Sequence, residues 1–203
     1  METQIPQKKI LGIDFYRKPT LFVARNLLGK VFVVKSAKGI ISGKIVETEA
    51  YIGSEDRACH ASWRRRGSCK NLWGEGGILY VYLTYGLHFM LNVVTEKEGF
   101  PSAVLIRAAE PIEGIDRMLQ NRFVANVSNL TSGPAKLTKA FGIDKSFDGK
   151  SLLGKFIYIE DRGFVVPSVK TSRRIGIDYA AEPWKSIKWR FYQDSPFVLR
   201  RNE

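Results

Sequence analysis

The chain has 203 residues and a formal net charge of +12, with 32 lysines and arginines against 20 aspartates and glutamates. This length suits one domain with a hydrophobic core, and the positive charge favours a polyanion such as nucleic acid as partner, although an ordinary basic surface would give the same balance. Two cysteines, a polar start and no apolar run of about 20 residues exclude a disulfide framework and a membrane span, so we expect an intracellular protein.

The first quarter of the chain predicts one helix followed by two antiparallel strands. Lys18–Lys30 contains Pro19 near its start, has apolar residues at helical spacing and ends at Gly29, which indicates a short amphipathic helix. The segments VFVVKS (31–36) and IISGKIVETEAYIG (40–53) are rich in β-branched residues and are separated by the turn AKG.

The second of these strands contains the acidic stretch IVETEAYIG. Because successive side chains of a strand point to opposite faces, the odd-numbered residues of this stretch should share one face: Ile45, Glu47, Glu49 and Tyr51. The spacing alone favours an exposed face whose glutamates pair with basic side chains over a catalytic site.

Residues 54–77 show no sustained periodicity and predict a long loop. The loop carries the cluster Arg64, Arg65 and Arg66 beside Trp63. A loop of this length is uncommon unless it binds something, and the alternative is a solvated loop with scattered charges.

The next segment, ILYVYLTYGLHFMLNVVTE (78–96), predicts a β-hairpin that turns near 84–87. Gly86 can adopt the positive φ that the turn needs, Tyr82 lies on the first strand, and Tyr85 falls at the tip. Tyr85 is either a surface residue packed on its own hairpin or a wedge between stacked bases that fills the gap left by an extruded nucleotide.

The rest of the chain predicts one more long strand, two helices and short strands. SAVLIRAAE (102–110) is the strand and carries Arg107 near its end. Helices are expected at 111–122, with Pro111 in the first turn, and within 131–143, where Lys136 and Lys139 share one side. Short strands are expected within 155–161, 169–177 and 188–194. We therefore predict one mixed α/β or α+β domain on mostly antiparallel strands, spanning 1–203 with a flexible start at 1–10.

The cysteines and histidines do not have the spacing of a metal site. Cys59, Cys69, His60 and His88 lie within thirty residues, but the chain has no CxxC or HxxxH pair and lacks the signature of zinc deaminases. Phosphate-binding glycine loops are also missing. We therefore expect no metal. The chain does contain an acid, flat aromatic side chains and an arginine, which are the groups that an enzyme acting on nucleobases needs.

Five blocks of the sequence occur in an order typical of one family. They are IVETEAYIGSEDRACHAS, LYVYLTYGLHFMLNVVT, VLIRAAEPIEG, SGPAKLTKAFGI, and RIGI followed by WRFYQDSPFVL, between about residues 21 and 199. In these blocks the chain resembles the alkyladenine (methylpurine, or 3-methyladenine) DNA glycosylases. The resemblance implies an α+β fold, one compact domain around a curved, mostly antiparallel sheet with flanking helices.

The resemblance also implies an activity. It is that of a monofunctional hydrolase without metal or organic cofactor, which flips 3-methyladenine, 7-methylguanine, ethenoadenine or hypoxanthine out of duplex DNA. Hydrolysis of the N-glycosidic bond then leaves an abasic site and initiates base excision repair. The implied partner is double-stranded DNA with damaged purines, bound by a monomer away from membranes, in the cytoplasm or nucleoid of a prokaryote or the nucleus of a eukaryote.

The resemblance assigns roles by position in these blocks. Glu49 corresponds to the general base for the attacking water, and Arg107 to a residue near that water. The remaining assignments concern the base pocket and the DNA: Tyr51, His60 and Tyr82 as aromatic walls, Asn92 as the residue that hinders the guanine amino group, a main-chain carbonyl at Ile175, and Tyr85 as the intercalating residue. Glu47 has no counterpart and is interpreted as structural, or as an acid one layer behind the site.

Affinity for DNA should come mainly from basic side chains on phosphates and should fall steeply with salt. The candidates are Arg64, Arg65, Arg66, Lys136, Lys139, Arg173, Arg174, Lys185 and Lys188, each of which could equally be a solvated surface charge. The loop at 62–78 departs from the family pattern, with Leu72 and Trp73 where a Met-Phe-like pair is usual, and Cys69 has no family role.

Two other functions remain open at the level of sequence. One is a non-catalytic basic nucleic-acid-binding module, for example for structured RNA, in which the acids only pair with arginines. The other is a lyase that uses a lysine, and no sequence feature favours this function.

Overall fold

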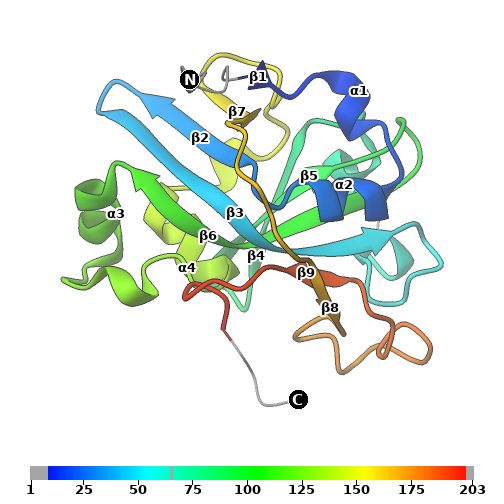
Figure 1. Cartoon of the computed structure of the whole chain (residues 1–203). Helices are drawn as coiled ribbons and strands as arrows, with labels where there is room; N and C mark the ends of the chain where they lie inside the picture. The colour runs from blue at the N-terminus through cyan, green and yellow to red at the C-terminus, as the bar shows by residue number, and fades with distance from the viewer. Residues whose placement is uncertain (1–8, 65, 200–203) are drawn as a thin grey trace, which may run out of the picture.

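One large antiparallel sheet organises the molecule (Figure 1). The structure, a computed structural model, describes residues 9–64 and 66–199, apart from the side chain of residue 68. The nine strands of the sheet are β1 (Lys9–Ile10), β2 (Val31–Ser36), β3 (Gly39–Ile52), β4 (Leu79–Thr84), β5 (His88–Val94), β6 (Ser102–Glu113), β7 (Ile157–Asp161), β8 (Lys170–Ser172) and β9 (Arg190–Tyr192).

The strand order is β1-β7-β2-β3-β6-β5-β4, with β9 paired to both β3 and β8. Every strand pair is antiparallel, which confirms the predicted α+β class. Of the start expected to be flexible, 1–8 lie outside the described residues, whereas Lys9–Ile10 pairs with β7.

Short helices flank the sheet at its two ends (Figure 1). They are α1 (Ile13–Tyr16), α2 (Thr20–Asn26), α3 (Ile115–Arg122) and α4 (Pro134–Phe141), with 3₁₀ segments η1 (His60–Ser62), η2 (Arg66–Trp73), η3 (Val127–Asn129) and η4 (Lys145–Phe147). Ala24 of α2, Met118 of α3 and Leu137 of α4 are fully buried in the main hydrophobic cluster together with residues of the strands. None of the helices in the described part of the chain is long and apolar enough to span a membrane.

Strand β3 lies at the centre of the sheet and changes partner along its length. Its first part pairs with β2 up to Lys44, and β9 pairs with Glu47, Thr48 and Glu49 further along. On the other edge, β6 pairs with β3 from Ser42 to Ile52. The register to β6 shifts between Ile45 and Glu47 and again before Thr48, which marks a β-bulge at the change of partner.

This bulge makes one prediction about the acidic stretch wrong. Ile45 is buried in the main cluster together with Ala50, on the side where the hydroxyl of Thr48 donates to the Ala24 carbonyl. Glu47 and Glu49 make their contacts elsewhere, with arginines. An irregular residue reverses the alternation, so Ile45 does not share a face with Glu49.

Two other boundaries differ from the sequence prediction. Pro111 is not in a helix, because β6 continues pairing with β3 through Glu113 and Pro111 lies opposite Gly43. The helix begins only after Gly114, whose positive φ of 74° and contact with the Ile40 carbonyl, 2.4 Å from where a Cβ would stand, leave room for glycine alone. The strand expected over 169–177 ends at Ser172.

Candidate active site

A pocket of about 570 Å³ lies beside the tip of the β4–β5 hairpin. It is bounded by the end of β3, η1, the hairpin, β6 and the segment 175–179. The five residues that the sequence predicted for the base pocket line it, namely Tyr51, His60, Tyr82, Asn92 and Ile175, and so do Arg107, predicted near the water, and Tyr85, predicted to intercalate. Glu49 is fully buried and makes contacts to three of these residues.

Three donors converge on the Glu49 carboxylate. The Tyr51 hydroxyl donates to Oε2 at 2.8 Å, the Ile175 backbone N–H donates to Oε1 at 2.7 Å, and an Arg107 guanidinium nitrogen lies 3.2 Å from Oε2. These donors come from β3, β6 and the segment after β8, so the sheet and a loop together fix the orientation of the carboxylate. Tyr51 therefore both donates a hydrogen bond to Glu49 and forms part of the pocket wall.

Glu47 holds the arginine that contacts Glu49. Its Oε1 accepts from Arg107 Nε and from Arg190 Nε, both at 2.7 Å, and all three side chains are buried. Burial alone would lower the pKa of Arg107, but the charges of Glu49 and Glu47 raise it above the ordinary value. The glutamates do pair with basic residues, as the alternative to catalysis expected, but on a buried face.

A group of three rings, His60, Tyr80 and Tyr82, forms another part of the pocket wall. His60 Nδ1 is 2.7 Å from the Tyr80 hydroxyl, and the ring centroids of His60 and Tyr82 are 4.2 Å apart. Burial, and secondarily the charge of Arg64, lower the pKa of His60 from 6.5 to about 3. His60 is therefore an uncharged ring at neutral pH, suited to stack on or hydrogen-bond a base.

The lowered pKa of His60 predicts a pH-dependent contribution to stability. Between pH 3 and 6.5 the unfolded chain binds a proton that folded His60 does not bind, so the free energy of unfolding rises with pH across this window and falls on acidification. We expect His60→Asn to flatten this rise, as measured by urea unfolding of the wild type and the variant from pH 4 to 7. Parallel curves for wild type and His60→Asn would contradict the assignment.

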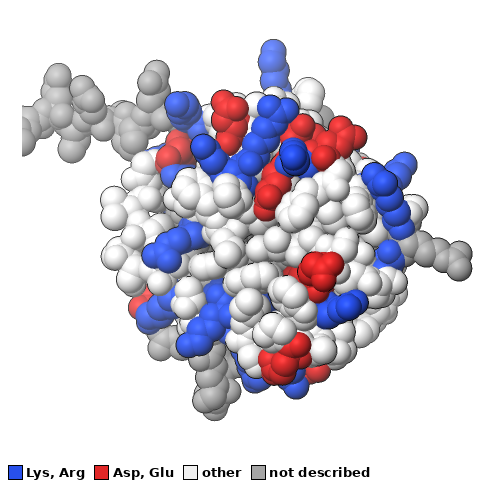
Figure 2. Space-filling model, turned by 90° about the vertical axis from the view of Figure 1, so that its right-hand side faces the viewer, with Lys and Arg blue, Asp and Glu red and all other residues white. Residues whose placement is uncertain are grey.

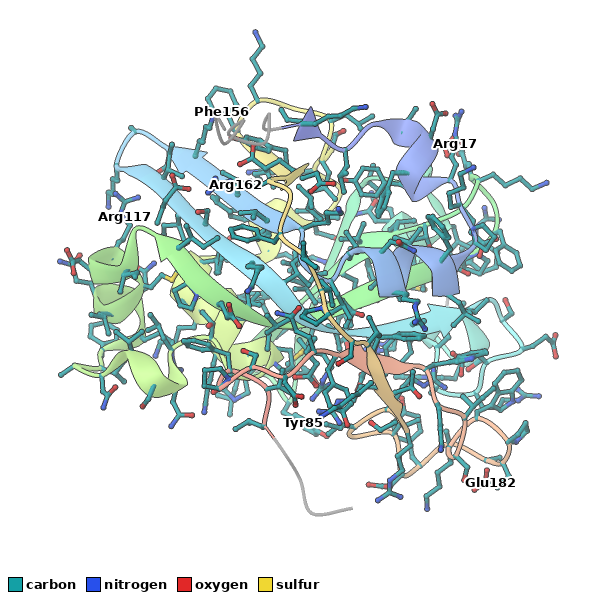
Figure 3. The ribbon with its side chains drawn as sticks, in the orientation of Figure 1. Arg17, Tyr85, Arg117, Phe156, Arg162 and Glu182 are labelled. Carbon is teal, nitrogen blue, oxygen red and sulfur yellow. The ribbon has the colours of Figure 1, made fainter. Side chains whose placement is uncertain are left out.

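The hairpin presents Tyr85 to solvent. Tyr85 and Gly86 have φ values of 49° and 66°, and the Leu87 N–H donates to the Thr84 carbonyl, as in a type I′ turn. Tyr85 is 88% exposed and Leu87 is 76% exposed. Figure 3 shows Tyr85 on the lower edge of the molecule, far from Arg17 and Phe156. A tyrosine held at a positive φ and left this exposed is not packed against its own hairpin.

Asn92 lies on β5, the second strand of the hairpin, between Tyr80 of β4 and Leu105 of β6. Its side-chain nitrogen donates to the carbonyls of Tyr80 and Met90, at 3.1 and 3.4 Å. The amide is therefore fixed by the backbone of its own hairpin, with 4% of the residue exposed.

Arg174 is not a phosphate ligand, and that prediction is wrong. It is 3% exposed and forms a two-pronged ion pair with Asp56, with N···O distances of 2.6 and 2.8 Å, and it also donates to the Ala50 carbonyl. The ion pair joins β3 and the loop after it to the segment that supplies the Ile175 N–H.

The other basic candidates fall in different places. Arg64 lines the pocket, Arg66 lies over the Trp73 ring, and Lys139 and Arg173 are exposed, whereas Lys136 is half-buried near the Ser132 hydroxyl. Arg65 lies outside the described residues. On the face shown in Figure 2, acidic and basic side chains are mixed along the upper rim, and basic ones gather at the lower left.

Both cysteines are buried thiols in a small cluster next to the pocket, which also contains Leu72 and the partly buried Trp73. The divergent loop therefore packs behind the aromatic wall. Across residues 9–64 and 66–199, no group of three or more His, Cys, Asp or Glu residues is arranged to hold a metal ion.

The sequence analysis missed three groups that the structure places at the site. Tyr80, Arg190 and Asp56 each hold a predicted residue in position. Tyr80 could have been found, since it alternates with Tyr82 on the same strand. Arg190 and Asp56 could not, because their partners are 143 and 118 residues away.

Comparison with known proteins is consistent with this geometry. The family model described as methylpurine-DNA glycosylase matches residues 14–196. A protein of Desulfitobacterium hafniense is 46% identical over 200 residues, covering 94% of this chain and 98% of that protein. A protein of Chlorobaculum parvum is 46% identical over 194 residues, with 94% and 90% covered, and one of Methanocella arvoryzae is 46% identical over 195 residues, with 95% and 96% covered. All three carry the name "Putative 3-methyladenine DNA glycosylase".

Proposed function

We propose that this chain, which belongs to the methylpurine-DNA glycosylase family, removes damaged purines from duplex DNA with a water molecule activated by Glu49. As a member of that family it is a DNA repair enzyme and a hydrolase of N-glycosyl bonds. The observation that supports the finer proposal is the buried Glu49 carboxylate, held by three donors directly behind an aromatic pocket.

The position of Glu49 suits the chemistry of the reaction. Cleavage of the bond between C1′ and the purine leaves positive charge on the sugar, which a nearby carboxylate stabilises, and the carboxylate also takes a proton from the water that bonds to C1′. Glu49 contacts three residues that line the pocket, so the proposed water site is the pocket floor among Tyr51, Arg107 and Ile175. Arg107 and the Ile175 N–H would then hold the acid in the orientation that receives the proton.

The walls suit a flat purine. Tyr51, Tyr82 and uncharged His60 offer aromatic surfaces to a flipped base, and Asn92 offers a fixed amide that a guanine amino group would meet. The substrates we propose are 3-methyladenine, 7-methylguanine, ethenoadenine and hypoxanthine. One chain supplies every part of this pocket, so we propose that the enzyme acts on DNA as a monomer.

Tyr85 would hold the damaged base outside the helix by filling the gap it leaves. We expect Tyr85→Ala to slow excision from duplex DNA roughly tenfold or more, because unstacking a base costs a few kcal/mol that the wedge offsets. The free energy of unfolding should hardly change, since Tyr85 is 88% exposed. Single-turnover rates on duplex and single-stranded substrates measure the effect.

Phe156→Ala is the matched control, because Phe156 is another exposed aromatic residue and lies on the upper part of the molecule (Figure 3). An equal loss of rate on duplex and single strands in Tyr85→Ala would contradict the wedge role.

Base release from defined lesions tests the proposed function. Duplex oligonucleotides with one hypoxanthine, ethenoadenine or 7-methylguanine are incubated with the protein, and free base and alkali-labile sites are quantified. We expect free base and alkali-labile sites to form in equal amounts. Salt-sensitive DNA binding without release of any base would support a binding module instead, and a protein–DNA adduct trapped by borohydride would support a lyase.

A further inference from the structure

Arg64 belongs to the base pocket, although the sequence suggested a phosphate ligand. Its backbone N–H donates to the His60 carbonyl at 2.8 Å, which turns the chain back toward the pocket directly after η1. The central carbon of its guanidinium lies 5.0 Å from the centroid of the Trp63 ring and 5.6 Å from that of Tyr82. The cation therefore sits over an aromatic surface that a flipped base would use.

The charge of Arg64 is not balanced in the way that the other charges of the site are. Glu47 and Glu49 are matched by Arg107 and Arg190, and Asp56 is matched by Arg174. Among the residues that the structure describes, no carboxylate lies within ion-pairing distance of Arg64, so this group adds one positive charge to the pocket wall.

The charge acts on the rings that would hold the base. Arg64 contributes to the lowered pKa of His60, and it opposes the rise that burial causes in the pKa of Tyr80 and Tyr82. A ligand that lies against these rings is therefore exposed to the same positive potential, which is strong because the surroundings are partly buried.

The two chemical classes of damaged purine respond to this potential in opposite ways. When the C1′–N9 bond breaks, N9 keeps the electron pair, the oxygen of water bonds to C1′, and the carboxylate receives the proton. A neutral purine such as hypoxanthine or ethenoadenine thereby gains negative charge as it leaves. A purine alkylated at N3 or N7 is cationic when bound and leaves as a neutral molecule. A nearby guanidinium stabilises the first departure and repels the second substrate.

We propose that Arg64 determines specificity in this site by favouring neutral damaged purines over cationic alkylated ones, an inference that rests on the function proposed above. The aromatic walls alone attract a cationic base, and Arg64 offsets that attraction. The divergent loop at 62–78 supplies this arginine, so the change in sequence would be a change in substrate preference.

The test is the ratio of single-turnover excision rates on duplexes with ethenoadenine and with 7-methylguanine. We expect Arg64→Gln to lower the ratio of the neutral to the cationic lesion about tenfold, a shift of the size expected from one partly screened charge. Arg64→Lys keeps the charge and should keep the ratio near the wild-type value. Arg66→Gln is the matched control, since Arg66 also lies over a ring, 4.6 Å from the centroid of Trp73, but does not line the pocket.

The outcomes separate the possible roles of Arg64. If Arg64→Gln weakens DNA binding and lowers the excision rates of both lesions by the same factor, Arg64 binds a phosphate and the inference is overturned. If Arg64→Lys shifts the ratio as much as Arg64→Gln does, shape rather than charge is responsible, and the inference is also overturned. Failure of the wild-type protein to release either base would refute the proposed function itself, which is a different result from an unchanged ratio.

Discussion

Replacing Glu49 with glutamine is expected to lower the single-turnover excision rate by roughly a thousandfold, in the range associated with loss of a general base and of charge stabilisation. The amide has nearly the size of the carboxylate but cannot take a proton from water or oppose the positive charge on the sugar. Arg107 keeps its contact with Glu47 at 2.7 Å, so the buried network retains one of its two acids. The protein should remain folded and should still bind DNA.

The measurement combines excision rates, binding affinity for a lesion duplex and thermal unfolding. Glu55→Gln is the matched control, because Glu55 is exposed in the loop that follows β3 and should be dispensable. An excision rate for Glu49→Gln close to that of the control would show that Glu49 is a structural acid. A variant that unfolds would be replaced by Glu49→Asp, which keeps the charge but moves it away from the Ile175 N–H, and should lose rate with little change in affinity.

Replacing Asp56 with alanine is expected to lower the free energy of unfolding by about 3–5 kcal/mol, because it leaves the Arg174 guanidinium buried without its ion-pair partner. Asp56 also accepts from the Ile52 and Ala58 backbone N–H groups, at 3.2 and 3.0 Å. For a chain of this length such a loss corresponds to a fall in melting temperature of roughly 6–20 °C. Excision should slow as well, because Arg174 positions the segment that supplies the Ile175 N–H.

The control for this variant is an exposed ion pair. Arg17 and Glu75 lie 3.0 Å apart with about half of the Arg17 side chain exposed, and Arg17 is at the opposite edge of the molecule from Tyr85 (Figure 3). Arg17→Ala should leave the free energy of unfolding almost unchanged, because exposed ion pairs contribute little to stability. Similar losses of stability in Arg17→Ala and Asp56→Ala would contradict the view that the buried pair anchors the site.

Much of the fold could be predicted because local pattern and final structure agree. The alternating pattern and the turn residues of the β4–β5 hairpin correctly predicted both strands and the tip. Pro134 and Gly142 likewise indicated where α4 begins and ends. Pro111 misled because proline suits a first helical turn, whereas pairing with β3 held the chain extended for three more residues. Tertiary pairing outweighed the local preference there.

The site could be predicted only in part, for a similar reason. The pocket residues were assigned through motif blocks, and the structure brings them together. The alternation of IVETEAYIG predicted the wrong face for Ile45. A bulge where a strand changes partner cannot be recognised from the spacing of residues in the sequence. Arg174 and Arg64 look alike in sequence as basic residues near others, yet one is buried in an ion pair and the other lies over pocket rings.

The central claim is that a flipped purine occupies the aromatic pocket with water between its sugar and Glu49. A crystal structure of the Glu49→Gln protein bound to a duplex with one ethenoadenine tests it most directly. We predict that the base lies against Tyr82 and His60 and that the Tyr85 ring fills the gap in the duplex. We also predict a water molecule that is hydrogen-bonded to the side chain of residue 49 and has its oxygen in contact with C1′. A base that stays stacked in the helix, or that lies in the pocket with C1′ turned away from residue 49, would contradict the account.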